Sequence, residues 1–266
     1  MEEKEVWGSR FYTFDAETAR TFHTPFQKVN LITNPVFGRM LFLDGILQSA
    51  SSDEHIYHDA LVKVGMKGSI EPVRRVLIGG GAEGAVLREV YAMGPHVQEA
   101  IMVDWDKDLV EDLRKNETMN ERSFHDERTK VYYVNITKFV VTTPKKFHAI
   151  FLDLLDPSME TVEWLENLVN RATLKLTDNG ILTMNLGGNA YIAMEFLKRL
   201  HVDGFGEWYI LPYKTFVPSF HQEWYFLSMC RRQFKGFVGS SLQAFLTIRR
   251  TGAEFLSLDK CTIVTI

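Results

Sequence analysis

The sequence predicts an α/β fold, with a mostly parallel sheet preceded by a small N-terminal β-domain. Up to about residue 70, short apolar runs alternate with turn residues. Beyond it, strand and helix patterns alternate, and glycines fill the first turn between them. We therefore expect a β-hairpin and meander domain over residues 1–70 and a Rossmann-like domain over residues 71–266.

Three short strands and a helix are expected before that boundary. Residues 27–32, 39–43 and 46–49 are apolar runs separated by turns that contain Asn, Asp, Pro and Gly, which predicts a β-meander. Asp53 then precedes apolar residues at helical spacing, so a helix is expected from there to about residue 64.

After Pro72 the spacing of the apolar runs predicts parallel strands joined by helices. The expected strands lie at 73–78, 100–103, 131–134, 149–152 and 180–184, and helices begin near residues 86, 109 and 164. Two further strands, 208–216 and 223–229, are close enough in sequence to form a hairpin on the same sheet.

Composition and charge exclude several classes of protein. The 266 residues contain 30 Lys and Arg against 34 Asp and Glu, a formal charge of −4, so no basic face for nucleic acid is expected. No run approaches the ~18 apolar residues of a membrane span, and the acidic residues 1–5 are unlike a signal peptide. Two cysteines, Cys230 and Cys261, are too few for a disulfide framework or a zinc site. We expect a cytoplasmic protein with a small-molecule substrate and with neither a nucleic-acid nor a membrane partner.

A strand that runs directly into glycines predicts a nucleotide-binding edge. Gly79, Gly81 and Gly84 fit the pattern G-x-G-x-x-G, and Asp104 follows at the end of the next expected strand, 20 residues after Gly84. Glycines let the backbone approach a nucleotide, and the acid can accept hydrogen bonds from ribose hydroxyls. The alternative is a tight turn between strand and helix that binds nothing.

Glu83, inside this glycine loop, favours one class of nucleotide over another. A carboxylate there would repel a dinucleotide pyrophosphate by roughly 1–4 kcal/mol, whereas it would attract a sulfonium or an ammonium group. This favours an S-adenosyl-type compound over NAD. The alternative is a solvated acid that the helix dipole stabilises.

Two more carboxylates are expected at the same edge. Asp153 and Asp156 follow the strand at 149–152, and ligands of open α/β sheets bind outside the carboxyl ends of strands. Paired carboxylates can bind an amine and remove its proton. The alternative makes Asp153 a loop residue and Asp156 a turn former before Pro157.

The helix expected at 53–64 carries polar residues of uncertain role. Asp53 could be only an N-cap. His55 and His58 are expected to be surface histidines, because nothing supplies metal-ligand spacing, and no metal site is expected.

Taken together, these segments resemble the polyamine aminopropyltransferases, the spermidine/spermine synthase family. The resemblance covers about residues 26 to 230, and its motifs occur in the family's order. The matching segments are Phe26-Gln27, the Leu-Asp-Gly…Gln stretch at 43–48, the Asp-Glu…Tyr-His stretch at 53–58, the glycine loop at 80–85 (Glu83 stands where the family has Asp), Asp153 to Pro157, and Pro218 to Trp224.

The resemblance implies a methyltransferase-type Rossmann-like catalytic domain and a reaction. Decarboxylated S-adenosylmethionine would donate its aminopropyl group to a polyamine amine and leave as methylthioadenosine, without a metal. Asp153 would orient and deprotonate the amine, with help from Tyr57. The residues implied on the polyamine side are Asp156, His58, Gln222 and Trp224; on the donor side they are Gln27, Gln48, Gly80, Gly81, Glu83, Gly84, Asp104 and Asn135. A homodimer is also implied.

Departures from the family pattern leave both the amine acceptor and the activity itself open. Asn135 replaces an Asp, Leu154 and Leu155 replace two hydroxyl residues, and Phe216 lies near the position of a Tyr. The alternatives are an N-methyltransferase of the same fold that uses ordinary S-adenosylmethionine, and a non-catalytic homologue that binds a polyamine or a nucleoside. An NAD-dependent dehydrogenase rests on the glycine pattern alone.

Overall fold

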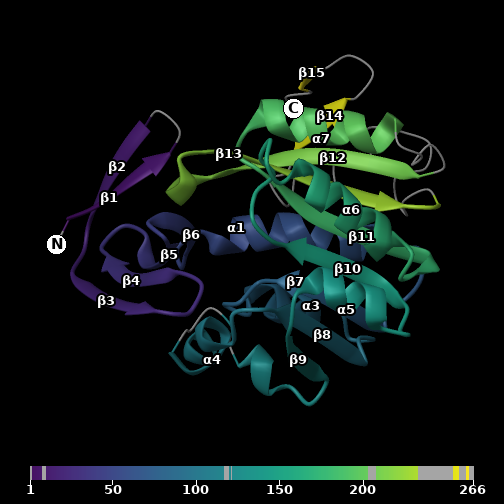
Figure 1. The fold of residues 1–266 in the computed structure, drawn as a ribbon, viewed down its shortest axis with the longest axis horizontal. Helices are drawn as coiled ribbons and strands as arrows, with labels where there is room; N and C mark the ends of the chain where they lie inside the picture. Colours follow the sequence, from purple (N-terminus) through teal and green to yellow (C-terminus); the bar gives the residue numbers. More distant parts are fainter. Residues whose placement is uncertain are drawn as a thin grey trace.

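The computed structural model describes residues 2–7, 10–116, 120, 122–202, 208–232, 254–257 and 262–263. Cys261 lies outside them. The strands are β1 (Glu2–Trp7), β2 (Arg10–Asp15), β3 (Thr18–His23), β4 (Lys28–Asn34), β5 (Gly38–Leu43), β6 (Ile46–Ala50), β7 (Arg75–Gly80), β8 (Glu99–Asp104), β9 (Thr129–Tyr133), β10 (Phe147–Asp153), β11 (Leu176–Gly187), β12 (Tyr209–Val217), β13 (Gln222–Cys230), β14 (Glu254–Ser257) and β15 (Thr262–Ile263). The α-helices are α1 (Glu54–His58), α2 (Val64–Gly68), α3 (Ala85–Met93), α4 (Lys107–Asn116), α5 (Ile136–Thr142), α6 (Val162–Thr173) and α7 (Ala190–Val202) (Figure 1).

The N-terminal part is a four-stranded antiparallel sheet in the order β3-β4-β5-β6, with β1 and β2 forming a separate hairpin. The expected meander is confirmed, because β4, β5 and β6 cover the three predicted strands. β1, β2 and β3 were not expected. Charged and hydroxyl residues interrupt their apolar residues, as in the Thr-Ala-Arg-Thr-Phe-His of β3, so no apolar run marks them.

A helical run from 54 to 68 connects the two parts of the chain. α1 and α2 are joined by a π-helical turn, Asp59–Lys63, which begins directly after Tyr57 and His58. π-helical turns inside helices often occur at functional sites. On α2, Gly65 lies so close to the large sheet that a Cβ there would be 2.6 Å from Thr183 Oγ1 on β11.

The large sheet has the order β15-β14-β12-β13-β11-β10-β7-β8-β9. β11, β10, β7, β8 and β9 are parallel, and β13 pairs antiparallel with both β11 and β12, which confirms the α/β class and the expected hairpin. From β7 the chain first adds β8 and β9 on one side, then β10 on the other. The strand order therefore reverses between β7 and β10, the point where open α/β sheets bind ligands.

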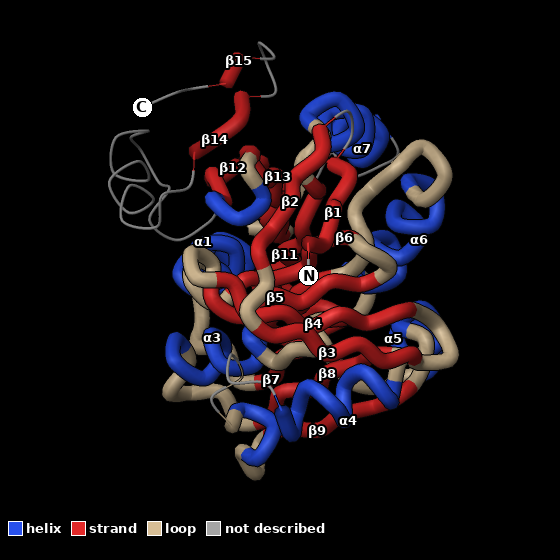
Figure 2. Tube along the Cα trace, turned by 90° about the vertical axis from the view of Figure 1, so that its left-hand side faces the viewer, coloured by secondary structure: helices blue, strands red, loops and turns tan. Residues whose placement is uncertain are grey.

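Two apolar clusters fill the two faces of this sheet. Figure 2 shows α1 and α3 on one face and α5, α6 and α7 on the other. α5 and α7 were not expected. The sequence of α5, Ile-Thr-Lys-Phe-Val-Val-Thr, is rich in β-branched residues and favours a strand when tertiary contacts are ignored. Among the described helices, none is long and apolar enough to cross a membrane.

Candidate active site

The glycine loop between β7 and α3 depends on glycines for its shape. Gly80, Gly81 and Gly84 have φ angles of 80°, 72° and 80°, a left-handed conformation that other residues rarely adopt. A Cβ on Gly80 would also lie only 1.8 Å from the carbonyl oxygen of Asp153. Glycine thus allows the end of β7 to lie directly against the end of β10, and this contact brings Glu83 close to Asp153.

Tyr57 donates a hydrogen bond of 2.6 Å from its hydroxyl to Oδ1 of Asp153. Its ring lies among the rings of Phe220, Trp224 and Phe226, with centroid distances of 6.2, 6.3 and 5.2 Å. Burial, and then the negative charge of Asp153, raise the pKa of Tyr57 well above its usual value. The phenol therefore remains protonated and holds the Asp153 carboxylate in one orientation.

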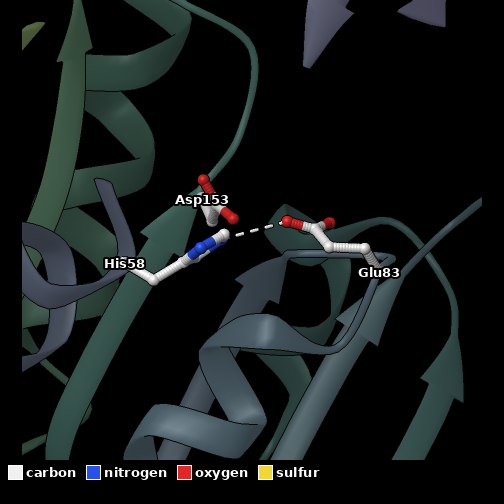
Figure 3. A group of neighbouring side chains, drawn as sticks. All are labelled: His58, Glu83 and Asp153. Carbon is white, nitrogen blue, oxygen red and sulfur yellow. Dashed lines mark hydrogen bonds and ion pairs between the residues drawn. The ribbon is translucent and has the colours of Figure 1, made fainter. Parts of the chain in front are cut away.

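His58 lies between two carboxylates, Glu54 on its own helix and Glu83 in the glycine loop. Figure 3 shows the His58 ring pointing toward Glu83, with Asp153 beside them. Nδ1 is 2.6 Å from Glu54 Oε2, and Nε2 is 3.1 Å from Glu83 Oε1. The expectation of a surface histidine is wrong for His58, which is 2% exposed, and right for His55, which is exposed. The sequence could not reveal this burial, because Glu83 is 25 residues away.

The pKa values of this group follow from its contacts. Burial alone would lower the pKa of His58, but the hydrogen bonds to Glu54 and Glu83 outweigh it and raise the pKa to about 10. Burial would raise the pKa of Glu54, but its bonds to His58 and Arg88 lower it to about 2. His58, Glu83 and Asp153 each have one side-chain nitrogen or oxygen atom within 4.8 Å of such an atom of the other two. Both ring nitrogens already contact carboxylates, so the geometry is that of ion pairing rather than of metal ligation.

Three aspartates around this group have raised pKa values. Burial is the main cause in each, followed by Asp106 and Glu83 for Asp104, by Glu83 for Asp153, and by Asp153 for Asp156. The pKa is about 6 for Asp104 and Asp153 and about 7 for Asp156. Asp156 has an exposed surface, yet enough protein surrounds its carboxyl group for desolvation to act on it. Acidic groups gathered in this way favour a cationic ligand.

Gln27 contacts a residue that was not expected in the site. Its Nε2 donates to Oδ2 of Asp106 at 2.8 Å, and Asp106 also accepts from the Thr24 hydroxyl at 2.7 Å. Asp106, 1% exposed, accepts from the backbone N–H of Leu109 as well, so it joins the meander to the start of α4. The signal that could have identified it is an acid between the end of a strand and the start of a helix.

Four other expected residues have their described contacts with groups other than Asp153. Gln48 is exposed and lines a pocket together with Tyr57 and His58. Asn135 caps α5, because its Oδ1 accepts from Thr137 N at 2.9 Å. Trp224 is buried, and Gln222 lies against Gly188, where a Cβ would be 2.2 Å from its Nε2.

Asp53 joins the start of α1 to the segment between β12 and β13. Asp53 occupies the N-cap position of α1, but its side chain makes no capping hydrogen bond. It accepts instead from Ser219 N at 2.6 Å and from the Ser219 hydroxyl at 2.9 Å. Phe220 follows immediately, so this contact holds one of the aromatic walls around Tyr57.

We expect Asp53→Ala to lower the free energy of unfolding by about 3 kcal/mol, because hydrogen bonds to a charged group contribute roughly 1.5–3 kcal/mol each. The buried N–H of Ser219 would also lose its acceptor. Urea unfolding measures the change. Ser52→Ala, an exposed neighbour, is the control, and equal losses in the two variants would contradict this role for Asp53.

Two family models match this chain. The model described as the spermine/spermidine synthase domain matches residues 54–238, more than half of the chain. The model described as the spermidine synthase tetramerisation domain matches residues 21–51, which include all of β4, β5 and β6.

Curated relatives and solved structures agree with these matches. The polyamine aminopropyltransferase of Saccharolobus solfataricus is 39% identical over 143 residues, 53% of this chain and 47% of the relative. Polyamine aminopropyltransferase 2 of Aquifex aeolicus is 32% identical over 235 residues, 84% of this chain and 44% of the relative. The chain thus spans about half the length of these relatives. Among solved structures, spermidine synthase from Thermotoga maritima superposes with a TM-score of 0.77 at 21% identity, covering 88% of this chain and 80% of that one. A spermidine synthase in complex with the transition-state analogue AdoDATO gives 0.78 at 21% identity, covering 88% and 81%.

Proposed function

The chain belongs to the spermine/spermidine synthase family, and we propose that it is an aminopropyltransferase. It would move the aminopropyl group of decarboxylated S-adenosylmethionine to a polyamine amine and release methylthioadenosine. The observation that carries the proposal is the Tyr57–Asp153 hydrogen bond of 2.6 Å beside Glu83, at the point where the strand order reverses. Both relatives described above are named polyamine aminopropyltransferases.

On the donor side, Glu83 would bind the ammonium of the aminopropyl group. The same carboxylate would repel the carboxylate of ordinary S-adenosylmethionine, which gives selectivity against the commoner compound. Asp104 would accept hydrogen bonds from the ribose, and the backbone at Gly80, Gly81 and Gly84 would lie against the nucleoside. Contacts to the donor from Gln27, Gln48 and Asn135 stay predictions.

On the acceptor side, Asp156, Gln222 and Trp224 would bind the polyamine. Its reacting ammonium, with a pKa near ~10.4 by analogy with Lys, must lose a proton before it can attack. Asp153, oriented by Tyr57, would accept that proton. The amine nitrogen then bonds to the aminopropyl carbon next to sulfur, the C–S bond breaks, and its electron pair stays on sulfur as the neutral thioether. One proton is released in each turnover.

Incubation of the purified protein with donor and acceptor tests this proposal. Decarboxylated and ordinary S-adenosylmethionine would each be offered with a panel of diamines and triamines, with products identified by mass spectrometry. We expect methylthioadenosine and an amine heavier by one aminopropyl group, from the decarboxylated donor only. Methylated amines formed from ordinary S-adenosylmethionine would identify a methyltransferase instead, and binding without any product would identify a non-catalytic homologue.

The raised carboxyl pKa values predict an acidic limit to activity. Asp153 and Asp104 have pKa values of about 6, so at pH 5 most of their carboxyl groups are protonated. A protonated Asp153 cannot accept the proton of the amine. We expect kcat/KM to rise with pH and to bend between about pH 6 and 7, with a rate at pH 5 roughly tenfold or more below that at pH 8. A profile with no bend in this range would contradict the assigned base.

We also propose that the chain forms a homo-oligomer. Support comes from the match of residues 21–51 to a domain described by its role in tetramerisation. The dimer implied by the sequence resemblance and a tetramer remain the two outcomes, and light scattering on the purified protein separates them. A cytoplasmic location and a domain boundary near residue 70 also stay predictions.

A further inference from the structure

The hydrogen-bond partners of His58 indicate which of its ring nitrogens carry hydrogen. Nδ1 is 2.6 Å from Glu54 Oε2 and 2.8 Å from the Glu54 backbone carbonyl oxygen, while Nε2 is 3.1 Å from Glu83 Oε1. Ionised carboxylates and carbonyl oxygens only accept hydrogen bonds. Arg88 contacts both oxygens of Glu54 at 2.9 Å and keeps that carboxylate ionised. Nδ1 of His58 must therefore carry hydrogen. The hydrogen bonds to Glu54 and Glu83 also raise the pKa of the ring to about 10, so Nε2 is protonated as well and the ring is an imidazolium.

An imidazolium with both N–H groups engaged cannot bind an amine substrate. It has no lone pair to accept a hydrogen bond from an ammonium, and its positive charge would repel one. The ring is also closed off, because His58 is 2% exposed and the Tyr57 ring packs edge-on against it at 5.2 Å. The polyamine contact that the sequence resemblance implies for His58 does not fit this geometry.

We propose that His58 is a positioning residue, a buried cation that holds the Glu83 carboxylate in place for the aminopropyl ammonium of the donor. The inference rests on the proposed function. It assigns His58 to the donor side of the site, and makes it act through Glu83 rather than on the substrate.

Glu83 needs such a partner because of where it stands. Glu83 lies between Gly81 and Gly84, which are both in left-handed conformations, and its side chain is buried among other acidic groups. The negative charge of Glu83 raises the pKa of both Asp153 and Asp104, so these carboxylates repel Glu83 in turn. Without His58 this repulsion would turn the carboxylate away from the carboxyl edge of the sheet.

Charges of alternating sign support His58 from behind. Glu83, His58, Glu54, Arg88 and Glu89 follow one another, each in contact with the next. The row starts in the glycine loop, crosses to α1 and returns to α3. His58 is the second residue of this row, and the carboxylates of Glu83 and Glu54 on either side neutralise its positive charge. The ring can therefore stay charged although it is buried.

A thermodynamic cycle on ligand binding tests this role. Decarboxylated S-adenosylmethionine has the aminopropyl ammonium, and methylthioadenosine lacks it. We expect His58→Gln to weaken binding of the first by roughly tenfold and that of the second by less than about twofold, measured by isothermal titration. In a Glu83→Gln background, His58→Gln should change binding of the decarboxylated donor by less than about twofold. His55→Gln, an exposed histidine on the same helix, is the matched control and should change neither.

Other results would contradict either the proposed function or the role of His58. If the wild-type protein binds neither ligand, the proposed function itself fails. If it binds both, then equal losses for the two ligands, no loss, or fully additive effects of the two substitutions would overturn the role of His58. Should His58→Gln fail to fold, nitrogen-15 NMR of the wild-type histidines at pH 8 carries the test: both ring nitrogens of His58 should be protonated, and a neutral ring would overturn the inference.

Discussion

Asp153→Asn should lower kcat/KM by about 10²–10⁴-fold, the usual contribution of a positioned general base, while the protein still folds. Asparagine matches aspartate in shape, so the Tyr57 hydroxyl keeps an acceptor, but an amide cannot take the proton of the amine. The measurement is product formation by mass spectrometry over a range of acceptor concentrations. Asp178→Asn, the same change at an exposed position on β11, is the control. A variant that retains most of its activity would mean that another group removes the proton.

The same substitution should leave the protein at least as stable at pH 8. Burial and Glu83 raise the pKa of Asp153 to about 6, so the folded state favours the protonated carboxyl. The ionised form therefore costs stability as pH rises from the unfolded value of about 4 through about 6, and this cost is fully present at pH 8. The asparagine never ionises. An active wild type that is less stable than its inactive variant would show that stability is lost at this site in exchange for a base.

Gly80→Ala is expected to damage both stability and activity. The left-handed φ of 80° disfavours alanine by about 1–2 kcal/mol, and a Cβ 1.8 Å from the Asp153 carbonyl oxygen forces the strand ends apart at a further cost of about 1–3 kcal/mol. Activity should fall by roughly 100-fold, because a shift of about 1 Å misplaces the base.

Gly45 offers a matched control for this prediction. Its φ of 82° is nearly the same, but nothing lies within 4 Å of the position of its Cβ. Gly45→Ala should therefore lose only about 1–2 kcal/mol of stability and keep its activity. Urea unfolding and the transfer assay on both variants separate backbone strain from close approach. Similar losses in the two would mean that the contact between β7 and β10 is not what requires glycine.

The fold could be predicted where apolar runs mark buried strands. β7 and β10 are covered by the sheet on both sides and by helices on both faces, so their sequences are nearly continuous apolar runs. α5 was missed because its β-branched residues are helical only in contact with the sheet and under the cap of Asn135. β3 was missed because its pairing with β4 stabilises it more than any pattern of its own.

The candidate site could be predicted in part, for a reason that lies in sheet geometry. Glu83 and Asp153 both follow strand ends, and parallel strands bring such ends to one edge, so their closeness follows from order along the chain. Contacts that depend on the direction of a side chain could not be predicted from the order of the strands. The burial of His58 and the bond of Asp53 to Ser219 each depend on a partner that no local pattern indicates. The pairing of Gln27 with Asp106 joins residues 79 positions apart, which a local pattern cannot show.

The contact between Asp53 and Ser219 has a consequence for biosynthesis, because it joins residues that are 166 positions apart. A ribosome that adds roughly 5–20 residues per second needs on the order of ten seconds or more to make the chain between them. During that time the N-terminal meander can fold from local pairings, whereas contacts of long sequence separation form slowly. The aromatic wall around Tyr57 therefore closes only after residue 219 has been synthesised. A nascent chain of the first 200 residues would contain Tyr57 and Asp153 and still lack the aromatic rings that enclose Tyr57.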